Sequence, residues 1–185
     1  MVKVASSMLP LGTSAPDFLL TDTISNKQLS LNKLKGDKGT VVCFICNHCP
    51  YVKHVIDELP KIANDYSNRG MGFVAINSND ITKYPDDSPE NMKKFAEIHN
   101  FTFPYLFDET QEVGQAYQAM CTPDFYVFDS NNILVYRGQL DDSRLGNNIK
   151  VSGNSIRAAL DCLLEGQVVS FKQKPSLGCS IKWKD

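Results

Sequence analysis

Two continuous apolar runs, separated by an amphipathic segment, constrain the fold of this chain more than any other feature. Residues 40–45 and 71–77 are rich in β-branched and aromatic side chains, as in strands that are buried on both faces. Between them, apolar residues spaced by three and four over 50–66 predict a helix, with Pro50 in its first turn and a kink at Pro60. A strand, a helix and a strand within about 40 residues form a βαβ unit, so we predict that the two strands are parallel.

The remaining segments predict a single domain over residues 1–185, because no repeat or linker divides the chain. Residues 10–39 indicate a hairpin-like extension with one short helix. Beyond the loop at 78–89, Ser88 is a predicted N-cap for a helix that ends at His99. Further predicted elements are a short strand at 103–107, a short helix at 109–117, a hairpin of 124–129 with 133–138, and a last helix over 152–165. The tail, 167–185, has no clear periodicity.

Composition excludes several classes of protein. A chain of 185 residues that is 42% hydrophobic and 22% charged is not disordered, collagen-like or a coiled coil. Nineteen basic against 21 acidic side chains, with no basic run, argue against a nucleic-acid partner. No apolar stretch approaches the roughly 18–20 residues of a membrane span, and residues 1–8 lack the apolar core of a secretory signal. We therefore expect a cytoplasmic protein with neither a nucleic-acid nor a membrane partner.

The segment with the clearest chemistry is Cys46-Asn-His-Cys49-Pro50, at the junction of the first buried strand and the helix. N–H groups at a helix start stabilise an anion and lower the pKa of a thiol there, and the thiolate attacks disulfides or peroxides. We expect Cys46 to have the depressed pKa and to attack, Cys49 to resolve the mixed disulfide, and positive charge on His48 to favour the thiolate. The alternative is half of a zinc site, but no similar pair of ligands follows in the chain, so we expect no metal.

Thr122-Pro123, before the predicted hairpin, is a second feature that fits redox chemistry. Proline is expected at the first residue of a strand, and the X–Pro bond is the common place for a cis peptide. A cis-proline would leave the backbone of Thr122 free to pair with an extended substrate. An ordinary trans proline that begins a strand remains the alternative.

The six cysteines of the chain are too sparse for a disulfide scaffold, so the four outside the Cys46–Cys49 pair are expected to be thiols. Cys43 and Cys162 lie at positions where we expect them to pack in the core. Cys121 and Cys179 are accessory redox candidates, with simple packing as the alternative for each. The many apolar residues of the tail predict that it packs on the domain, and Gly178 permits a close backbone approach beside Cys179.

Five more side chains are expected to be structural, exposed or at the rim of a pocket. His54 lies more than a helical turn beyond Cys49 and is predicted to be exposed to solvent. Asp141, Asp142 and Arg144 form a charged loop, either solvated or at the rim of a pocket, and Trp183 is predicted to anchor the tail.

These motifs together resemble a known family. The Cys46-x-x-Cys49 pair after a buried strand, the βαβ unit, and Thr122-Pro123 before a hairpin and last helix are similar to the thioredoxin fold. Pro-Asp-Phe at 16–18, the insertion at 78–117 and the segment 103–108 resemble its AhpC/TSA and TlpA-like branch. The motifs C-N-H-C-P-Y-V, Y-R-G-x-x-D-D-S-R and P-S-x-G-C-x-I-K-W-K, which span 46–52, 136–144 and 175–184, resemble a group of thioredoxin-like AhpC/TSA-family proteins. The resemblance implies an α/β thioredoxin fold, a central mixed β-sheet flanked by helices, with an N-terminal extension and an insertion.

The function that this reading favours is a thiol–disulfide oxidoreductase that needs no cofactor. Its partners are expected to be protein or small-molecule disulfides and an unidentified thiol reductant. Asn47 and Pro50, beside the cysteines, and Thr122-Pro123 are the substrate-binding candidates.

Two alternatives remain open. One is a thiol-dependent peroxidase with Arg137 in its pocket, although the P-x-x-x-T-x-x-C loop of peroxiredoxins is absent and Cys46 stands where they have Thr or Ser. The other is a metal-binding or redox-sensing module that uses Cys46, His48, Cys49 and Cys179. Thioredoxin itself also differs, because Ile45 replaces its tryptophan and Thr40 replaces its buried acid.

Overall fold

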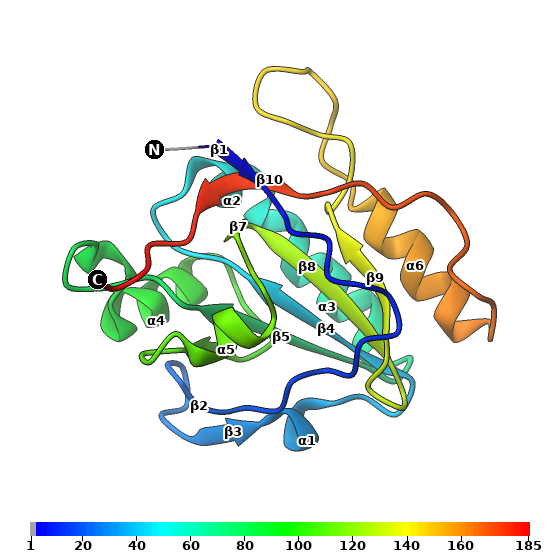
Figure 1. Cartoon of the computed structure of the whole chain (residues 1–185), viewed down its shortest axis with the longest axis horizontal. Coiled ribbons are helices and arrows are strands. Elements are labelled where there is room, and N and C mark those ends of the chain that lie inside the picture. The colour runs from blue at the N-terminus through cyan, green and yellow to red at the C-terminus, as the bar shows by residue number, and fades with distance from the viewer. Residues whose placement is uncertain (1–2) are drawn as a thin grey trace.

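Strand β4 (Gly39–Phe44) is buried along its whole length and lies inside a mixed seven-stranded sheet of order β3-β2-β6-β5-β4-β8-β9. The description rests on a computed structural model and covers residues 3–185 (Figure 1). β4 pairs in parallel with β5 (Met71–Asn77), as predicted, and antiparallel with β8 (Asp124–Asp129). β9 (Leu134–Gly138) completes the predicted hairpin with β8. The expected central mixed sheet is confirmed.

The N-terminal extension and the insertion build the other side of this sheet. β2 (Leu19–Asp22) and β3 (Gln28–Ser30) form the expected hairpin, followed by the short helix α1 (Leu31–Leu34). β6 (Tyr105–Phe107), from the insertion, lies between β5 and β2.

The helix after β4 is broken where the sequence predicts a kink. It runs as α2 (Pro50–Val55), a 3-10 turn η1 (Ile56–Glu58) and α3 (Leu59–Ser67), because Pro60 has no N–H to continue the ladder. Ser88 caps α4 (Pro89–Ile98) by accepting the N–H of Asn91, as predicted. The remaining helices are η2 (Pro85–Asp87), α5 (Glu112–Ala116) and α6 (Asn154–Leu164).

Two apolar cores lie on the two faces of the sheet, because successive side chains of a strand point to opposite faces. Val41 and Cys43 of β4 pack in the core that contains the buried faces of α2, α3 and α6. Val42 and Phe44 pack in the other core, which the N-terminal segment and the end of the tail complete. The prediction that Cys43 is a core residue is confirmed, and Cys162 is partly buried against the first core.

A small second sheet, not predicted from the sequence, joins the two ends of the chain. β10 (Leu177–Ser180) lies between β1 (Lys3–Ala5) and β7 (Cys121–Thr122) and is antiparallel to both. In Figure 1 the tail runs back from α6 to this sheet. Trp183 packs against the second core, which confirms that it anchors the tail. Within residues 3–185, no helix has both the length and the apolar character needed to cross a bilayer.

Candidate active site

The Cys46–Cys49 segment connects the end of β4 to the start of α2, so the helix begins after the second cysteine. Cys49 is the N-cap of α2 and Pro50 is the first helical residue. Both sulfurs are buried, with 1% of Cys46 and none of Cys49 exposed. The Cys46 Sγ lies 3.1 Å from the Thr122 Oγ1, and the Cys49 Sγ lies 3.3 Å from the Thr122 carbonyl oxygen. The structure therefore brings together the two motifs singled out in the sequence, and the Thr122–Pro123 bond is cis.

A third cysteine completes the cluster. The Cys179 Sγ lies 2.8 Å from the Cys49 Sγ, in contact but beyond the ~2.05 Å of a disulfide bond. β10 brings it there, because Cys179 is the partner of Thr122 in the antiparallel register. A Cβ on Gly178 would lie 2.0 Å from the Thr122 carbonyl oxygen, so a larger residue would push β10 away. The predicted close approach at Gly178 is confirmed, and of the two readings of Cys179 left open by the sequence, the structure places it beside the pair.

The negative charge of the cluster belongs on Cys49. A hydrogen bond from the Cys46 thiol lowers the pKa of Cys49 to about 5, against the opposing effect of burial. The Cys179 thiol and the backbone N–H groups of Val52 and Cys179 also donate to this sulfur and lower its pKa. These donors favour the thiolate form of Cys49 at neutral pH and outweigh burial and the Thr122 carbonyl oxygen, which lies 3.3 Å from the same sulfur.

The other two thiols of the cluster hold their protons. Burial raises the pKa of Cys46 well above its ordinary value, and its hydrogen bond to Cys49 and the charge of Asp87 raise it further. Burial and the contact with Cys49 raise the pKa of Cys179 to about 12. The expectation that Cys46 has the depressed pKa is wrong, because Cys49 is the N-cap of α2 and it is the Cys49 sulfur that the N–H of Val52, in the first turn, reaches.

Asp87 is a site residue that sequence reasoning missed. Its carboxylate is fully buried and accepts hydrogen bonds from the His48 Nδ1 at 2.7 Å, the Asn79 Nδ2 at 2.8 Å and the Asn47 N–H at 2.7 Å. Burial alone would raise the pKa of Asp87, but these bonds outweigh it and lower the pKa. Asp87 is the last residue of η2, 39 residues from His48, and no spacing in the sequence connects the two.

His48 bonds Asp87 through Nδ1, and no hydrogen bond described in residues 3–185 joins it to a sulfur atom. The hydrogen bond to Asp87 raises the pKa of His48, although burial opposes the shift. The imidazole ring also stacks on the ring of Tyr84, with the two ring centroids 5.1 Å apart. The carboxylate of Asp87 therefore neutralises much of the positive charge that His48 was expected to supply to the thiolate. Among the described residues, Cys46, His48 and Asp87 are the set that could hold a metal ion, with ligand atoms within 4.8 Å of one another, but His48 and Asp87 already bond each other.

Two of the substrate-binding candidates are occupied within the protein. Asn47 donates its side-chain amide to the Asp86 carbonyl and accepts from the Tyr105 hydroxyl, so it holds the loop in place. The backbone edge of Thr122 was expected to be open to substrate, and this expectation is wrong because β10 is paired with it. Pro50 is half-buried at the start of α2, and nothing in the structure tests its role.

Cys121 lies next to the cysteine cluster, whereas the described bonds of Arg137 lead away from it. Arg137 of β9 donates from Nη1 to the Gln173 Oε1 at 2.7 Å, so its described bonds tie it to the tail and not to a cysteine. Cys121 is buried in β7, next to Thr122, and burial raises its pKa far above the ordinary value. It is a neighbour of the cluster that keeps its proton.

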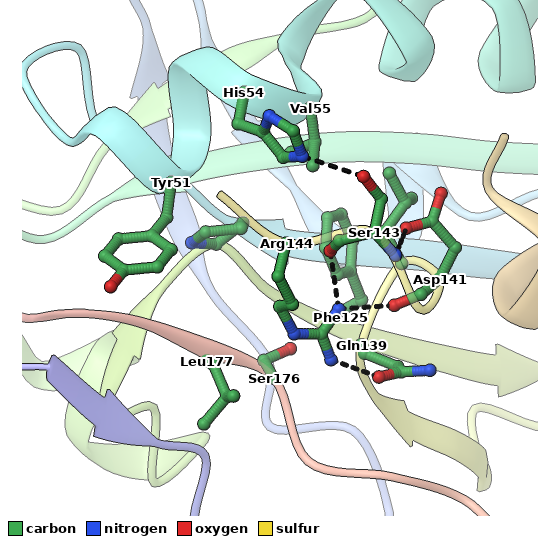
Figure 2. Close-up of a pocket in the computed structure, with 12 residues that line it drawn as sticks. Tyr51, His54, Val55, Phe125, Gln139, Asp141, Ser143, Arg144, Ser176 and Leu177 are labelled. Carbon is green, nitrogen blue, oxygen red and sulfur yellow. Dashed lines mark hydrogen bonds between the residues drawn. The ribbon is translucent and has the colours of Figure 1, made fainter. Parts of the chain in front are cut away.

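A small cavity of about 20 Å³ lies beside the site (Figure 2). The His54 Nε2 is 2.8 Å from the Ser143 Oγ, so the prediction that His54 is a solvent-exposed residue is wrong. Arg144 donates from Nη1 to the Asp141 carbonyl oxygen at 2.6 Å, and both residues line the cavity, which agrees with the pocket-rim alternative for this loop. The other lining residues include Tyr51, Pro123, Gln139, Ser176 and Leu177.

Comparison with known proteins agrees with this geometry. The model of the AhpC/TSA family matches residues 11–137, which is more than half of the chain. The chain belongs to the AhpC/TSA family. Two relatives are named thiol-disulfide oxidoreductase ResA, from Geobacillus thermodenitrificans and Geobacillus kaustophilus, and are 27% and 29% identical over 121 residues. Each match covers 65% of this chain and 64% of the relative, so the chain spans under two thirds of their length.

Solved structures match the AhpC/TSA chain over almost its whole length. An uncharacterised conserved protein from Geobacillus kaustophilus is 62% identical, with a TM-score of 0.98 over 100% of this chain and 97% of the other. A hypothetical protein from Sinorhizobium meliloti 1021 is 42% identical, with a TM-score of 0.95 over 97% of this chain and 98% of the other. A putative protein disulfide isomerase from Bacteroides thetaiotaomicron shares the fold alone, at 19% identity and a TM-score of 0.66 over 87% and 94%. The fold is the thioredoxin fold.

Proposed function

We propose that this AhpC/TSA-family protein is a thiol–disulfide oxidoreductase in which Cys46 and Cys49 cycle between dithiol and disulfide. The observation that carries the proposal is the position of the Cys49 sulfur, at the start of α2, 2.8 Å from the Cys179 sulfur and 3.3 Å from the carbonyl oxygen of Thr122, which precedes the cis Pro123. Hydrogen bonding from Cys46, Cys179 and Val52 lowers its pKa to about 5. A thiolate at neutral pH is the species that attacks a disulfide. The similarity to relatives named thiol-disulfide oxidoreductase supports the same chemistry.

The charge distribution sets the order of the steps. The Cys49 thiolate attacks one sulfur of the substrate disulfide, forms a mixed disulfide, and expels the other sulfur as a thiolate. Cys46 passes its proton to this leaving thiolate and becomes a thiolate itself. It then attacks the Cys49 sulfur, closes the Cys46–Cys49 disulfide and expels the second substrate thiolate. Two electrons pass from the cysteines to the substrate, and an external thiol restores the dithiol. This order reverses the one expected from the sequence.

Thr122 and Asp87 have opposite effects on the second step. The hydrogen bond with the Thr122 Oγ1 lowers the pKa of Cys46, whereas the charge of Asp87 raises it. Once Cys49 is in the mixed disulfide, its negative charge is gone, and Cys46 is easier to deprotonate. Cys46 therefore stays protonated until Cys49 has reacted, which suits a resolving thiol.

Trapping the mixed disulfide tests the function and the order of attack. Reduced protein is mixed with an excess of glutathione disulfide, and the adducts are measured by mass spectrometry. Because the Cys179 sulfur also contacts Cys49, the trap uses Cys46→Ser combined with Cys179→Ala, which should accumulate a glutathione adduct on Cys49, whereas Cys49→Ser should react at least tenfold more slowly than the wild type. Cys162→Ser, at a cysteine away from the cluster, is the control and should react as the wild type does. Failure of the wild type to reduce any disulfide would refute the function, and an adduct on Cys46 in Cys49→Ser at the wild-type rate would refute the order.

The same Cys49 thiolate makes a peroxidase the second candidate. Attack on a peroxide would give sulfenic acid on Cys49, and condensation with Cys46 would form the disulfide and release water. Arg137 is bonded to Gln173 and is not arranged to polarise a peroxide at Cys49. Consumption of hydrogen peroxide by the reduced protein, at a rate far above that of ordinary thiols, would favour this candidate instead. A cytoplasmic location and the absence of nucleic-acid and membrane partners stay predictions.

A further inference from the structure

β10 occupies the strand edge at which an extended substrate would meet the cysteines. Cys179 pairs with Thr122, and Ser180 with Cys121, in an antiparallel register. The pairing brings the Cys179 side chain over the reactive sulfur, with the two Sγ atoms 2.8 Å apart. The tail therefore presents a cysteine to Cys49 in the way that a bound polypeptide substrate would.

The tail is fixed on both sides of Cys179. β1 pairs with the other edge of β10 in the register Lys3 to Cys179 (Figure 1). Beyond β10, Ile181 is buried in the second core, and the N–H of Lys182 donates to the Asn79 Oδ1 at 2.9 Å. The Lys182 carbonyl in turn accepts the N–H of Asp80 at 2.8 Å. These contacts hold Cys179 at the site.

We propose that Cys179 is a third redox cysteine, which resolves mixed disulfides on Cys49 by forming a Cys49–Cys179 disulfide. The inference rests on the proposed function, since it needs a reactive Cys49. It adds a second resolving thiol besides Cys46, and this thiol comes from the C-terminal tail. The sulfur atoms need to approach by only about 0.8 Å to reach the ~2.05 Å of a disulfide bond.

The step balances in atoms and electrons. A substrate disulfide first reacts with the Cys49 thiolate, which gives a mixed disulfide and one free thiolate. This thiolate accepts the proton of Cys179, and the Cys179 thiolate attacks the Cys49 sulfur. The Cys49–Cys179 bond forms, the bond between Cys49 and the substrate breaks, and the second substrate thiolate leaves. Cys49 and Cys179 together lose the two electrons that the substrate gains.

Counting released thiolates tests the inference. Proteins that carry Cys46→Ser and Cys162→Ser receive one equivalent of dithiobis-nitrobenzoate, an aromatic disulfide whose thiolate is coloured. With Cys179 present, we expect two coloured thiolates for each reagent molecule consumed. With Cys179→Ala added, we expect one, and the protein should carry the second as a stable adduct. Peptide mapping should then show a Cys49–Cys179 linkage only in the first protein.

Cys121→Ala in the same background is the matched control, because Cys121 is as deeply buried and lies in the same small sheet. It should leave the count at two, which separates a redox role of Cys179 from a general loosening of the sheet. One thiolate with Cys179 present, together with a stable adduct on Cys49, would overturn the inference. That result leaves the Cys46–Cys49 mechanism intact, whereas a failure of the proposed function appears as a wild-type protein that reduces no disulfide.

Discussion

The charge on Cys49 predicts a specific dependence of stability on pH. Its pKa falls from an ordinary value of 9.0 to about 5 in the folded protein. Between these two values the unfolded chain binds a proton that the folded chain does not. Stability from this group is therefore fully present above pH 9, and it is lost as the pH falls towards 5.

The size of the effect follows from the shift. Each unit of pH within the window changes the free energy of unfolding by about 1.4 kcal/mol. Three units, from about pH 5 to about pH 8, therefore change it by about 4 kcal/mol in favour of the folded state at the higher pH. Cys49→Ala removes the ionising group, so the difference in stability between wild type and variant should grow by this amount.

The difference between the two proteins is needed because other groups titrate in the same window. Burial raises the pKa of Asp124 to about 7, and the bond to Asp87 raises that of His48, so both make the wild type less stable as the pH rises. The contribution of Asp124 is common to wild type and Cys49→Ala and cancels in the difference, whereas that of His48 is smaller in the variant because the charge of Cys49 helps to raise the pKa of His48. Urea unfolding of both reduced proteins at several pH values gives the difference directly.

Ultraviolet absorbance provides an independent measurement, because a thiolate absorbs where a thiol does not. The reduced wild type should show one thiolate forming near pH 5, and Cys49→Ala should lack it. A flat stability difference from about pH 5 to about pH 8, together with no thiolate below about pH 7, would refute the assignment of the charge to Cys49.

Three further predictions concern residues around the site. Asp87→Asn should return the pKa of His48 towards its ordinary 6.5, measured by NMR titration, and should cost about 3 kcal/mol or more because it breaks a buried pair. Gly178→Ala should cost about 1–3 kcal/mol in urea unfolding, since its Cβ meets a backbone carbonyl at 2.0 Å; an unchanged midpoint would contradict this contact. Above pH 7, Asp124→Asn should be more stable than the wild type by up to about 4 kcal/mol, because the wild type must ionise a buried carboxyl in the folded state and the variant has none. Equal stability of the two proteins at about pH 8 would show that Asp124 ionises freely.

The sequence by itself determined the fold and the reacting motif. Buried strands at 40–45 and 71–77 with a kinked helix between them follow from side-chain periodicity, which depends only on local geometry. The same local reasoning placed Cys46 and Cys49 at a strand–helix junction and Thr122-Pro123 immediately before strand β8. Local patterns were sufficient here because each motif is a continuous stretch of chain.

Only the tertiary structure decided which sulfur carries the charge and what surrounds it. Helix α2 begins at Pro50, one residue after Cys49, and the two N–H groups that reach this sulfur come from Val52 and from the distant Cys179. Asp87 reaches His48 across 39 residues of chain. β10 has no periodic pattern of its own and becomes a strand because β1 and β7 present free edges to it. A pKa depends on the sum of all charges and donors within a few ångströms, and those neighbours are chosen by the packing of distant segments.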